Sequence, residues 1–442
     1  MTKKQPASKK SASKKRPSPY HLERLPNGLV IGVRPMPHVE SAAIGVWVRA
    51  GGRYEPSRLA GVSHFLEHLL FKGTRTQSCE QLKRAVEGVG GSLNGFTAEE
   101  FTCYVAKVPA RHAQRATSTL CDMALHPRFA PRDIAKEREV ILEEIRMYED
   151  SPGQYVHELL NTLLWPRHPL GHLLAGSVET VRRMSRTEIQ RYWREHYHPR
   201  SLLVTCAGAV ETDQVVSRLR TLFAKAPNGR THQFSTAPRS PRGPQVHVIH
   251  KATEQTHVCL GIPTIPRTHP ARFALELLHV ILGANMSSRL FREIREKRGL
   301  AYEIGTQIKR YKDTGAFVIY AGCDAAKLLT TVQTAVAELV RIKRERVGPT
   351  ELRRAKDFYA GQLLMGLEDS MEHMIWMGEQ LVTAGDVSVM QDVIAAVERV
   401  TAEQIQQAAR MLFTPARLSL AVIGPVPKPE AARLEHACQR CA

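Results

Sequence analysis

Residues 61–71, Gly61-Val-Ser-His-Phe-Leu-Glu-His-Leu-Leu-Phe71, are apolar except for one serine, two histidines and one glutamate. An α-helix turns by 100° per residue, so His64, Glu67 and His68 fall on one face of the helix that this stretch predicts. Ionisable side chains are rarely placed in an apolar helix unless a partner compensates for their lost hydration. The stretch therefore predicts a buried helix with one chemically specialised face.

A divalent metal ion would satisfy both imidazoles, with Glu67 beside it as a general base for a water molecule at the metal. The alternative is an ordinary core helix in which both histidines hydrogen-bond to backbone groups. That alternative leaves the burial of Glu67 without an explanation. A third ligand elsewhere in the chain would decide between the two interpretations.

Residues 131–148, PRDIAKEREVILEEIRMY, contain a candidate for that third ligand. Asp133 can cap the helix that this segment predicts. Its core stripe, at steps of three and four, includes Glu137 and Glu144 on one face, whereas Glu143 is rotated away by 100°. We expect Glu144 to bind the metal and Glu137 to orient a ligand histidine. A solvated helix with both carboxylates in water is the alternative.

The order His-x-x-Glu-His, with a glutamate 76 residues after the second histidine, resembles the M16 family of zinc peptidases. These inverzincins include mitochondrial processing peptidase, insulin-degrading enzyme and pitrilysin, and the chain resembles a short, two-domain bacterial-type member. The resemblance covers nearly the whole chain after the first twenty residues. It implies one Zn²⁺ per chain, bound by His64, His68 and Glu144. It also implies that Glu67 is the general base and that Glu137 assists.

The formal net charge of +19 is concentrated in part at the N-terminus, where residues 1–19 supply +7 and contain no acidic residue. Their serine, proline and alanine content predicts a disordered tail. An organelle presequence is the alternative, but such segments are amphipathic and rich in arginine, whereas this one is rich in lysine and broken by proline. No nucleic-acid-binding motif accompanies the charge, so we expect no specific nucleic-acid partner.

The eight cysteines are scattered and mostly lie in apolar contexts, which favours free thiols in a reducing compartment. Cys438 and Cys441 form a C-x-x-C pair without a second pair or a nearby histidine, so the motif is only weak support for a metal or redox role. No run is long enough to cross a membrane, and the N-terminus lacks the apolar core of a signal peptide. We expect a cytoplasmic protein without a membrane partner, with the mitochondrial matrix as the alternative location.

The chain repeats one pattern of strands followed by helices, which predicts two α+β domains. Each domain is expected to pack helices on one face of a mostly antiparallel sheet, as in the duplicated M16 fold that forms half of a clamshell. The second half lacks His-x-x-Glu-His. The predicted organisation is a basic tail at 1–19, a zinc-binding catalytic domain at 20–228, a linker at 229–244, a homologous domain at 245–428 and a tail at 429–442.

The residues after Gly91 predict a turn into a strand. In M16 peptidases the matching strand is an open sheet edge near the zinc, to which the substrate adds as a further strand. By resemblance, Asn94 and Phe96 are candidates for substrate contacts. Turn chemistry at Asn94 and core packing at Phe96 are the alternatives.

Arg295 and Tyr302 are seven positions apart, on either side of a helix end that we expect at Gly299. They are similar to an M16 pair in which the arginine binds a substrate carbonyl and the tyrosine hydroxyl stabilises the developing oxyanion. A surface arginine and a core tyrosine are the alternatives. The helix that contains Arg295 is expected at about 287–298.

Together, these features predict a zinc-dependent endopeptidase that hydrolyses unfolded peptides or precursor segments inside a closed dimeric chamber. Both catalytic sets are present, so a homodimer is expected, with Arg295 and Tyr302 serving the zinc site of the partner chain. A heterodimer with a sister subunit is the alternative assembly. The alternative function is a non-catalytic assembly subunit of the same fold, which the intact motifs disfavour.

Overall fold

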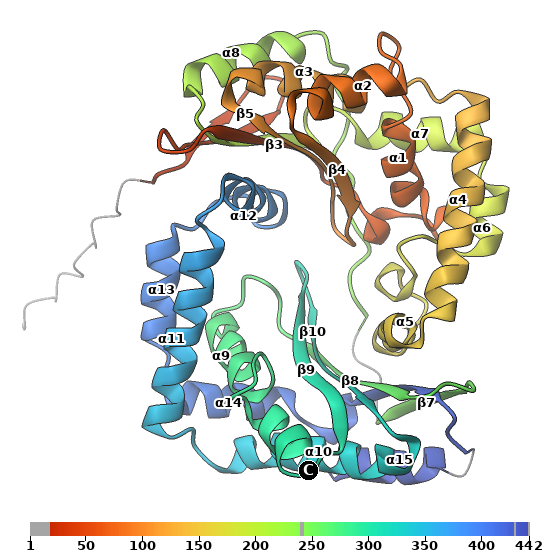
Figure 1. Cartoon of the computed structure of the whole chain (residues 1–442), viewed down its shortest axis with the longest axis vertical. Coiled ribbons are helices and arrows are strands. Elements are labelled where there is room, and N and C mark those ends of the chain that lie inside the picture. The colour runs from red at the N-terminus through yellow and green to blue at the C-terminus, as the bar shows by residue number, and fades with distance from the viewer. Residues whose placement is uncertain (1–17, 239–242, 428–429, 441–442) are drawn as a thin grey trace, which may run out of the picture.

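The computed structural model of the chain describes residues 18–238, 243–427 and 430–440. These residues form two halves, each built on one β-sheet with helices packed against it (Figure 1). All but the last two residues of the predicted basic tail, 1–19, lie outside the described residues. Among the described helices, none is both long and apolar enough to cross a lipid bilayer.

The N-terminal sheet has six strands in the order β1-β2-β6-β3-β5-β4, and of these only β2 and β6 run parallel. The predicted, mostly antiparallel sheet is therefore confirmed. Strand β4 pairs with β5 alone and forms one edge of the sheet. The strands are β1 (His21–Arg24), β2 (Val30–Pro35), β3 (Ser41–Val48), β4 (Ser92–Thr97), β5 (Thr102–Pro109) and β6 (Leu202–Gly208).

Seven helices of the N-terminal half pack around this sheet and against one another. Several begin at a serine whose hydroxyl accepts a backbone N–H of the first turn, which satisfies groups that the helix leaves unpaired. The helices are α1 (Val62–Leu70), α2 (Cys79–Val86), α3 (Ala113–Leu125), α4 (Pro131–Asp150), α6 (Val178–Arg183), α7 (Arg186–His196) and α8 (Thr212–Leu222).

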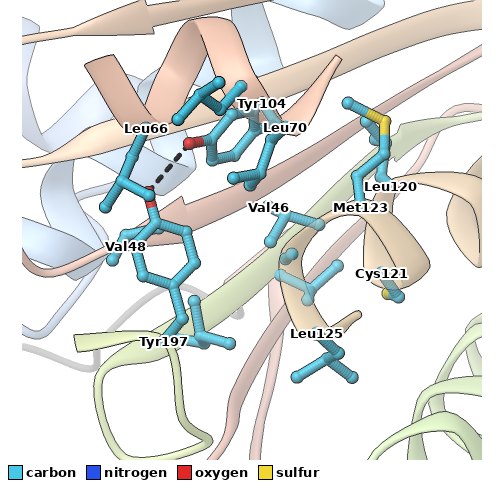
Figure 2. Packing of buried hydrophobic residues seen from close by; sticks show 14 of the residues in the cluster. Val46, Val48, Leu66, Leu70, Tyr104, Leu120, Cys121, Met123, Leu125 and Tyr197 are labelled. Atoms are coloured by element: carbon cyan, nitrogen blue, oxygen red, sulfur yellow. Dashed lines mark hydrogen bonds between the residues drawn. The ribbon is translucent and has the colours of Figure 1, made fainter. Parts of the chain in front are cut away.

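The apolar face of α1 is fixed in the core of the N-terminal half. Leu66 and Leu70 pack with Val46 of β3 in one buried cluster (Figure 2). The hydroxyls of Tyr104 and Tyr197 hydrogen-bond to each other there at 2.8 Å, so neither polar group is buried without a partner. Each buried leucine contributes about 1.5–3 kcal/mol of hydrophobic stabilisation. This burial sets the orientation of the polar face of α1.

The C-terminal half repeats the topology, with a sheet in the order β7-β11-β8-β10-β9 in which β7 and β11 run parallel. Its strands are β7 (Gln245–His250), β8 (Thr256–Thr264), β9 (Ala301–Arg310), β10 (Gly315–Cys323) and β11 (Ser419–Gly424). Its helices are α9 (Arg272–Leu282), α10 (Leu328–Arg344), α11 (Pro349–Gly366), α13 (Met390–Glu398), α14 (Ala402–Leu412) and α15 (Glu430–Gln439).

One helix of each half packs on the sheet of the other half. Helix α5 (Pro152–Leu164) leaves the N-terminal half and packs on β8 and β11, whereas α12 (Ser370–Thr383) leaves the C-terminal half and packs on β3 and β6 (Figure 1). Sequence analysis placed helices on one face of each sheet and did not anticipate this exchange. Periodicity reports that a helix has a buried face and does not report which sheet covers it.

A buried ionic cluster joins the two halves close to the start of α1. Arg53 is 1% exposed and donates to Glu100 at 2.7 Å, to Asp313 at 2.5 Å and to the carbonyl of Ser235 at 3.0 Å. Asp313 lies in the turn between β9 and β10, and Ser235 lies in the predicted linker. Removing Arg53 would leave the buried carboxylate of Glu100 without its ionic partner, at a typical cost of about 3–5 kcal/mol.

Two local predictions differ from the structure. The segment 429–442, predicted as a tail, contains α15, whose Leu434 and Ala437 are buried in the core of the C-terminal half. The helix predicted at 287–298 is largely a short π-helical segment, Phe291–Glu296. At α15, the burial of Leu434 and Ala437 against the rest of the C-terminal half accounts for the helix.

The contact between α12 and the N-terminal sheet leads to a stability prediction. A Cβ at Gly378 of α12 would lie 2.0 Å from the indole of Trp47, whereas Gly361 of α11 has no neighbour within 4 Å. Overpacking costs about 1–3 kcal/mol, which exceeds the ~1 kcal/mol that alanine gains over glycine in a helix. We expect Gly378→Ala to lower the urea midpoint and Gly361→Ala to raise it slightly. Equal stability of Gly378→Ala and wild type would contradict this packing.

Candidate metal centre

Helix α1 is held at its N-terminus by a buried carboxylate. Glu55 accepts the backbone N–H groups of Gly61 at 2.6 Å and Ser63 at 2.7 Å. Gly61 has φ +94°, and a Cβ there would lie 2.5 Å from the carbonyl oxygen of Ala175, so glycine is needed at this turn. A carboxylate at a helix N-terminus satisfies free N–H groups and complements the helix dipole. This anchor lies directly before His64.

Three predicted ligands converge between α1 and α4. The Nε2 atoms of His64 and His68 lie 3.8 Å and 3.6 Å from Oε2 of Glu144, and the two imidazole centroids are 4.7 Å apart. One ligand atom from each of the three residues lies within 4.8 Å of the others, which makes this the one such group within the described residues. Glu143 instead points outward and pairs with Arg146.

The protonation of the two histidines suits metal binding. Burial, and to a lesser extent the neighbouring His68, lowers the pKa of His64 to about 4, so this imidazole is neutral at pH 7. Nδ1 of His68 lies 3.2 Å from Oε2 of Glu137. A proton on Nδ1 shared with that carboxylate leaves the lone pair of Nε2 directed toward Glu144.

Glu137 is 3% exposed and has a second partner that sequence analysis did not identify. Nζ of Lys72 lies 2.8 Å from Oε1 of Glu137. The Lys72 ammonium therefore compensates the buried negative charge of Glu137, whose other carboxylate oxygen lies next to His68. Lys72 lies two residues after the end of α1, so helical periodicity gave no signal for this contact.

The three convergent residues fit a zinc ion. Their nitrogen–oxygen separations of 3.6 Å and 3.8 Å are too long for hydrogen bonds. They are close to the edge of about 3.4 Å of a tetrahedron whose bonds are about 2.0–2.1 Å, the usual lengths for zinc with imidazole or carboxylate. Two imidazoles and one carboxylate are a donor set typical of catalytic zinc.

Glu67 lies beside this group without belonging to it. Its Oε2 accepts a hydrogen bond of 2.9 Å from Oγ1 of Thr97, at the end of β4. Burial raises the pKa of Glu67, while the Thr97 hydrogen bond and His68 act in the opposite direction. A carboxylate next to a metal site and outside its ligands can exchange protons with a reacting group.

The two predicted contact residues on β4 do not point toward Glu67. The ring of Phe96 packs against Trp47 and Phe101 in a different cluster, and the exposed Asn94 accepts the N–H of its own neighbour, Gly95. Side chains alternate along a strand, so Leu93, Gly95 and Thr97 share one face of β4, and Thr97 bonds to Glu67 there. Asn94 and Phe96 therefore lie on the opposite face of β4 from Glu67, and their backbone groups face β5.

Arg295 and Tyr302 lie in the C-terminal half, away from the elements that build the metal centre. The guanidinium of Arg295 lies 5.2 Å from the ring centroid of Tyr302 and 4.9 Å from that of Phe291. Tyr302 is 75% exposed, so the alternative of a core tyrosine is wrong. The segment Phe291–Glu296, which carries Arg295, packs against α10 and against β9, the strand that contains Tyr302. Helix α1 packs against α4, β4, β5 and α7.

Comparison with known proteins gives a consistent result. The insulinase model of peptidase family M16 matches residues 33–178, and the M16 inactive-domain model matches residues 183–359. An uncharacterised zinc protease of Streptomyces coelicolor is 37% identical, over 93% of this chain and 91% of that protein. The uncharacterised zinc protease YmxG of Bacillus subtilis is 34% identical, over 90% and 97% respectively.

Solved structures show the same fold. A protease from Helicobacter pylori aligns with a TM-score of 0.86 at 22% identity, over 91% of this chain and 99% of that one. An M16 inactive-domain protein from Pseudomonas fluorescens also aligns with a TM-score of 0.86, at 17% identity, over 92% and 98%. The sequence matches extend over nearly the full length of relatives that are named zinc proteases. This chain therefore belongs to the M16 peptidase family.

Proposed function

We propose that this chain is a zinc-dependent endopeptidase that hydrolyses unfolded peptides or precursor segments. The observation that carries the proposal is the convergence of His64, His68 and Glu144 on one point, with Glu67 beside them. Membership of a family whose relatives are named zinc proteases supports the same activity.

His64, His68 and Glu144 would hold one Zn²⁺, which when bound polarises a scissile carbonyl and makes water a stronger nucleophile. Glu67 accepts the proton of the attacking water and later delivers it to the leaving amine nitrogen. Burial raises the pKa of the Glu67 carboxyl, which makes it a better proton donor in that second step. Glu137 and Lys72 keep His68 in the tautomer that binds metal.

An extended substrate would add to the open edge of β4. Within the described residues the strand pairs on one side only, so the backbone groups of its outer edge can pair with a peptide. The N–H of Gly95 would exchange its present acceptor, Oδ1 of Asn94, for the peptide. Main-chain pairing selects for an unfolded segment and tolerates varied side chains. The backbone groups at this edge belong to Leu93, Gly95 and Thr97, because those of Asn94 and Phe96 face β5. Asn94 would contribute through its exposed side chain, and Phe96 through its packing beneath the strand.

We infer further that two chains close around a chamber and that Arg295 and Tyr302 complete the zinc site of the partner chain. The exposure of Tyr302, with Arg295 against its ring, leaves its hydroxyl accessible to a partner or a substrate. A tyrosine hydroxyl that donates to the developing oxyanion would stabilise the transition state. A homodimer is the simplest such assembly.

A non-catalytic assembly subunit of the same fold is the second candidate. The observation that favours it is the match of residues 183–359 to a model of inactive M16 domains. The two functions differ in one measurable property, which is zinc-dependent hydrolysis.

The proposal predicts that the zinc-loaded, purified chain cleaves a quenched unstructured peptide and that a chelator stops the cleavage. Glu67→Gln should keep its zinc and lose kcat by about 10²–10⁴-fold, because the general base is removed. Fluorescence and metal analysis measure the two properties. Absence of cleavage by the wild type would favour the assembly subunit. Loss of zinc from Glu67→Gln would make Glu67 a ligand and contradict its assignment.

Two neighbouring glutamates on α4 provide a matched test of the metal ligands. Glu144→Gln should weaken zinc binding by at least about 100-fold, since loss of even an outer hydrogen-bond partner of a ligand typically costs 10–100-fold. Glu143→Gln should have no effect, because this side chain is exposed and pairs with Arg146. Competition with a chelating dye measures both affinities. Similar zinc affinities for the two variants would refute the ligand assignment.

The trans arrangement predicts complementation between two defective chains. A dimer of one Glu67→Gln chain and one Tyr302→Phe chain, purified through two different tags, should regain one of its two sites and about half of the wild-type rate. Each homodimer of a single variant should remain impaired. A mixed dimer that is no more active than the average of the two homodimers would show that Tyr302 acts in its own chain or not at all.

A further inference from the structure

The edge strand β4 contacts the proposed general base with two residues on one face. Oγ1 of Thr97 donates a hydrogen bond of 2.9 Å to Oε2 of Glu67. Two residues before it, Gly95 leaves space that Glu67 occupies, because a Cβ there would lie 3.2 Å from Cγ of Glu67 and 3.1 Å from the ring of Phe71. Strand β4 therefore restricts the positions of both the aliphatic part and the carboxylate of the Glu67 side chain.

The two carboxylate oxygens of Glu67 have different surroundings. Oε2 accepts from Thr97, and no group in the described part of the chain donates to Oε1. The terminal torsion of a free glutamate is broad, so an unheld carboxylate would sample many orientations. A hydrogen bond to a carboxylate is stronger than one between neutral groups. The Thr97 hydroxyl therefore selects the orientation that leaves Oε1 as the free proton acceptor.

We propose that Thr97 is a positioning residue for Glu67 and fixes this carboxylate for proton transfer. The inference rests on the proposed function, because it acts through Glu67 as the general base. Thr97 also belongs to the strand to which substrate is proposed to add. One strand thus contacts both the peptide and the base, so the short β4 segment links their positions. Misplacement by about 1 Å can cost about 10²-fold in rate.

The position suits threonine in particular. A β-branched residue is favoured in a strand, and its hydroxyl is the group that reaches Glu67. Valine has nearly the same shape and lacks the donor, whereas serine keeps the donor. Thr97 pairs with Thr102 through the backbone of β5, and neither substitution alters that pairing. The hydroxyl can therefore be tested separately from the strand.

The test compares Thr97→Val and Thr97→Ser with the wild type, all as full-length zinc-loaded chains. Thr97→Val should lower kcat by about 10–100-fold with KM within about twofold. Zinc content and melting temperature should not change, and Thr97→Ser should restore kcat. In crystal structures, Glu67 should adopt one conformer in the wild type and several in Thr97→Val.

The matched control is Thr76→Val. Oγ1 of Thr76 also donates to a carboxylate, that of Asp122, at 2.9 Å, but at an exposed site before α2. This variant removes the same kind of bond and should leave kcat and the Glu67 conformer unchanged.

The outcomes separate this inference from the proposed function. A wild type that does not cleave would refute the peptidase proposal, and the conformers of Glu67 would still test the positioning. An active wild type together with an undiminished kcat in Thr97→Val would overturn the positioning alone. A rise in KM at constant kcat, loss of zinc, a lower melting temperature or failure of Thr97→Ser to restore kcat would also overturn it.

Discussion

The structure depends on the burial of a helix that carries its own ionisable residues. Leu66 and Leu70 fix one side of α1 in the core, and Glu55 binds the free N–H groups at its start. The opposite side must then present His64 and His68 to α4. Imidazoles and carboxylates removed from water require partners. Helix α4 supplies these partners, because Glu137 contacts His68 and Glu144 lies opposite both histidines.

The exchange of α5 and α12 makes the two halves mechanically dependent. Each sheet has helices of its own half and one helix of the other half packed on it, so neither half completes its core alone. The buried Arg53 adds an ionic link between the turn of β9–β10, the linker and the turn of β4–β5. These contacts leave the edge of β4 open, where backbone groups remain available.

The two halves share a strand order, and they use their polar residues differently. Helix α9 follows β8 as α1 follows β3, and it also carries a glutamate and a histidine. There, however, Glu276 pairs with Arg310, and Nδ1 of His279 lies 2.7 Å from the hydroxyl of Thr306. These residues are satisfied within the protein. In the first half, the corresponding lone pairs of His64 and His68 remain free for a metal.

The sequence determined the local elements and the residue types of the site, because helical periodicity places His64, Glu67 and His68 on one face and puts Glu137 in line with Glu144. It also determined the repeated α+β organisation. It did not reveal the roles of Thr97 and Lys72, which resemble ordinary strand and surface residues. It also did not reveal the exchange of α5 and α12 or the packing of α15. Only the tertiary structure decided these features, because a hydrophobic pattern shows that a face is buried and carries no information about its distant partner.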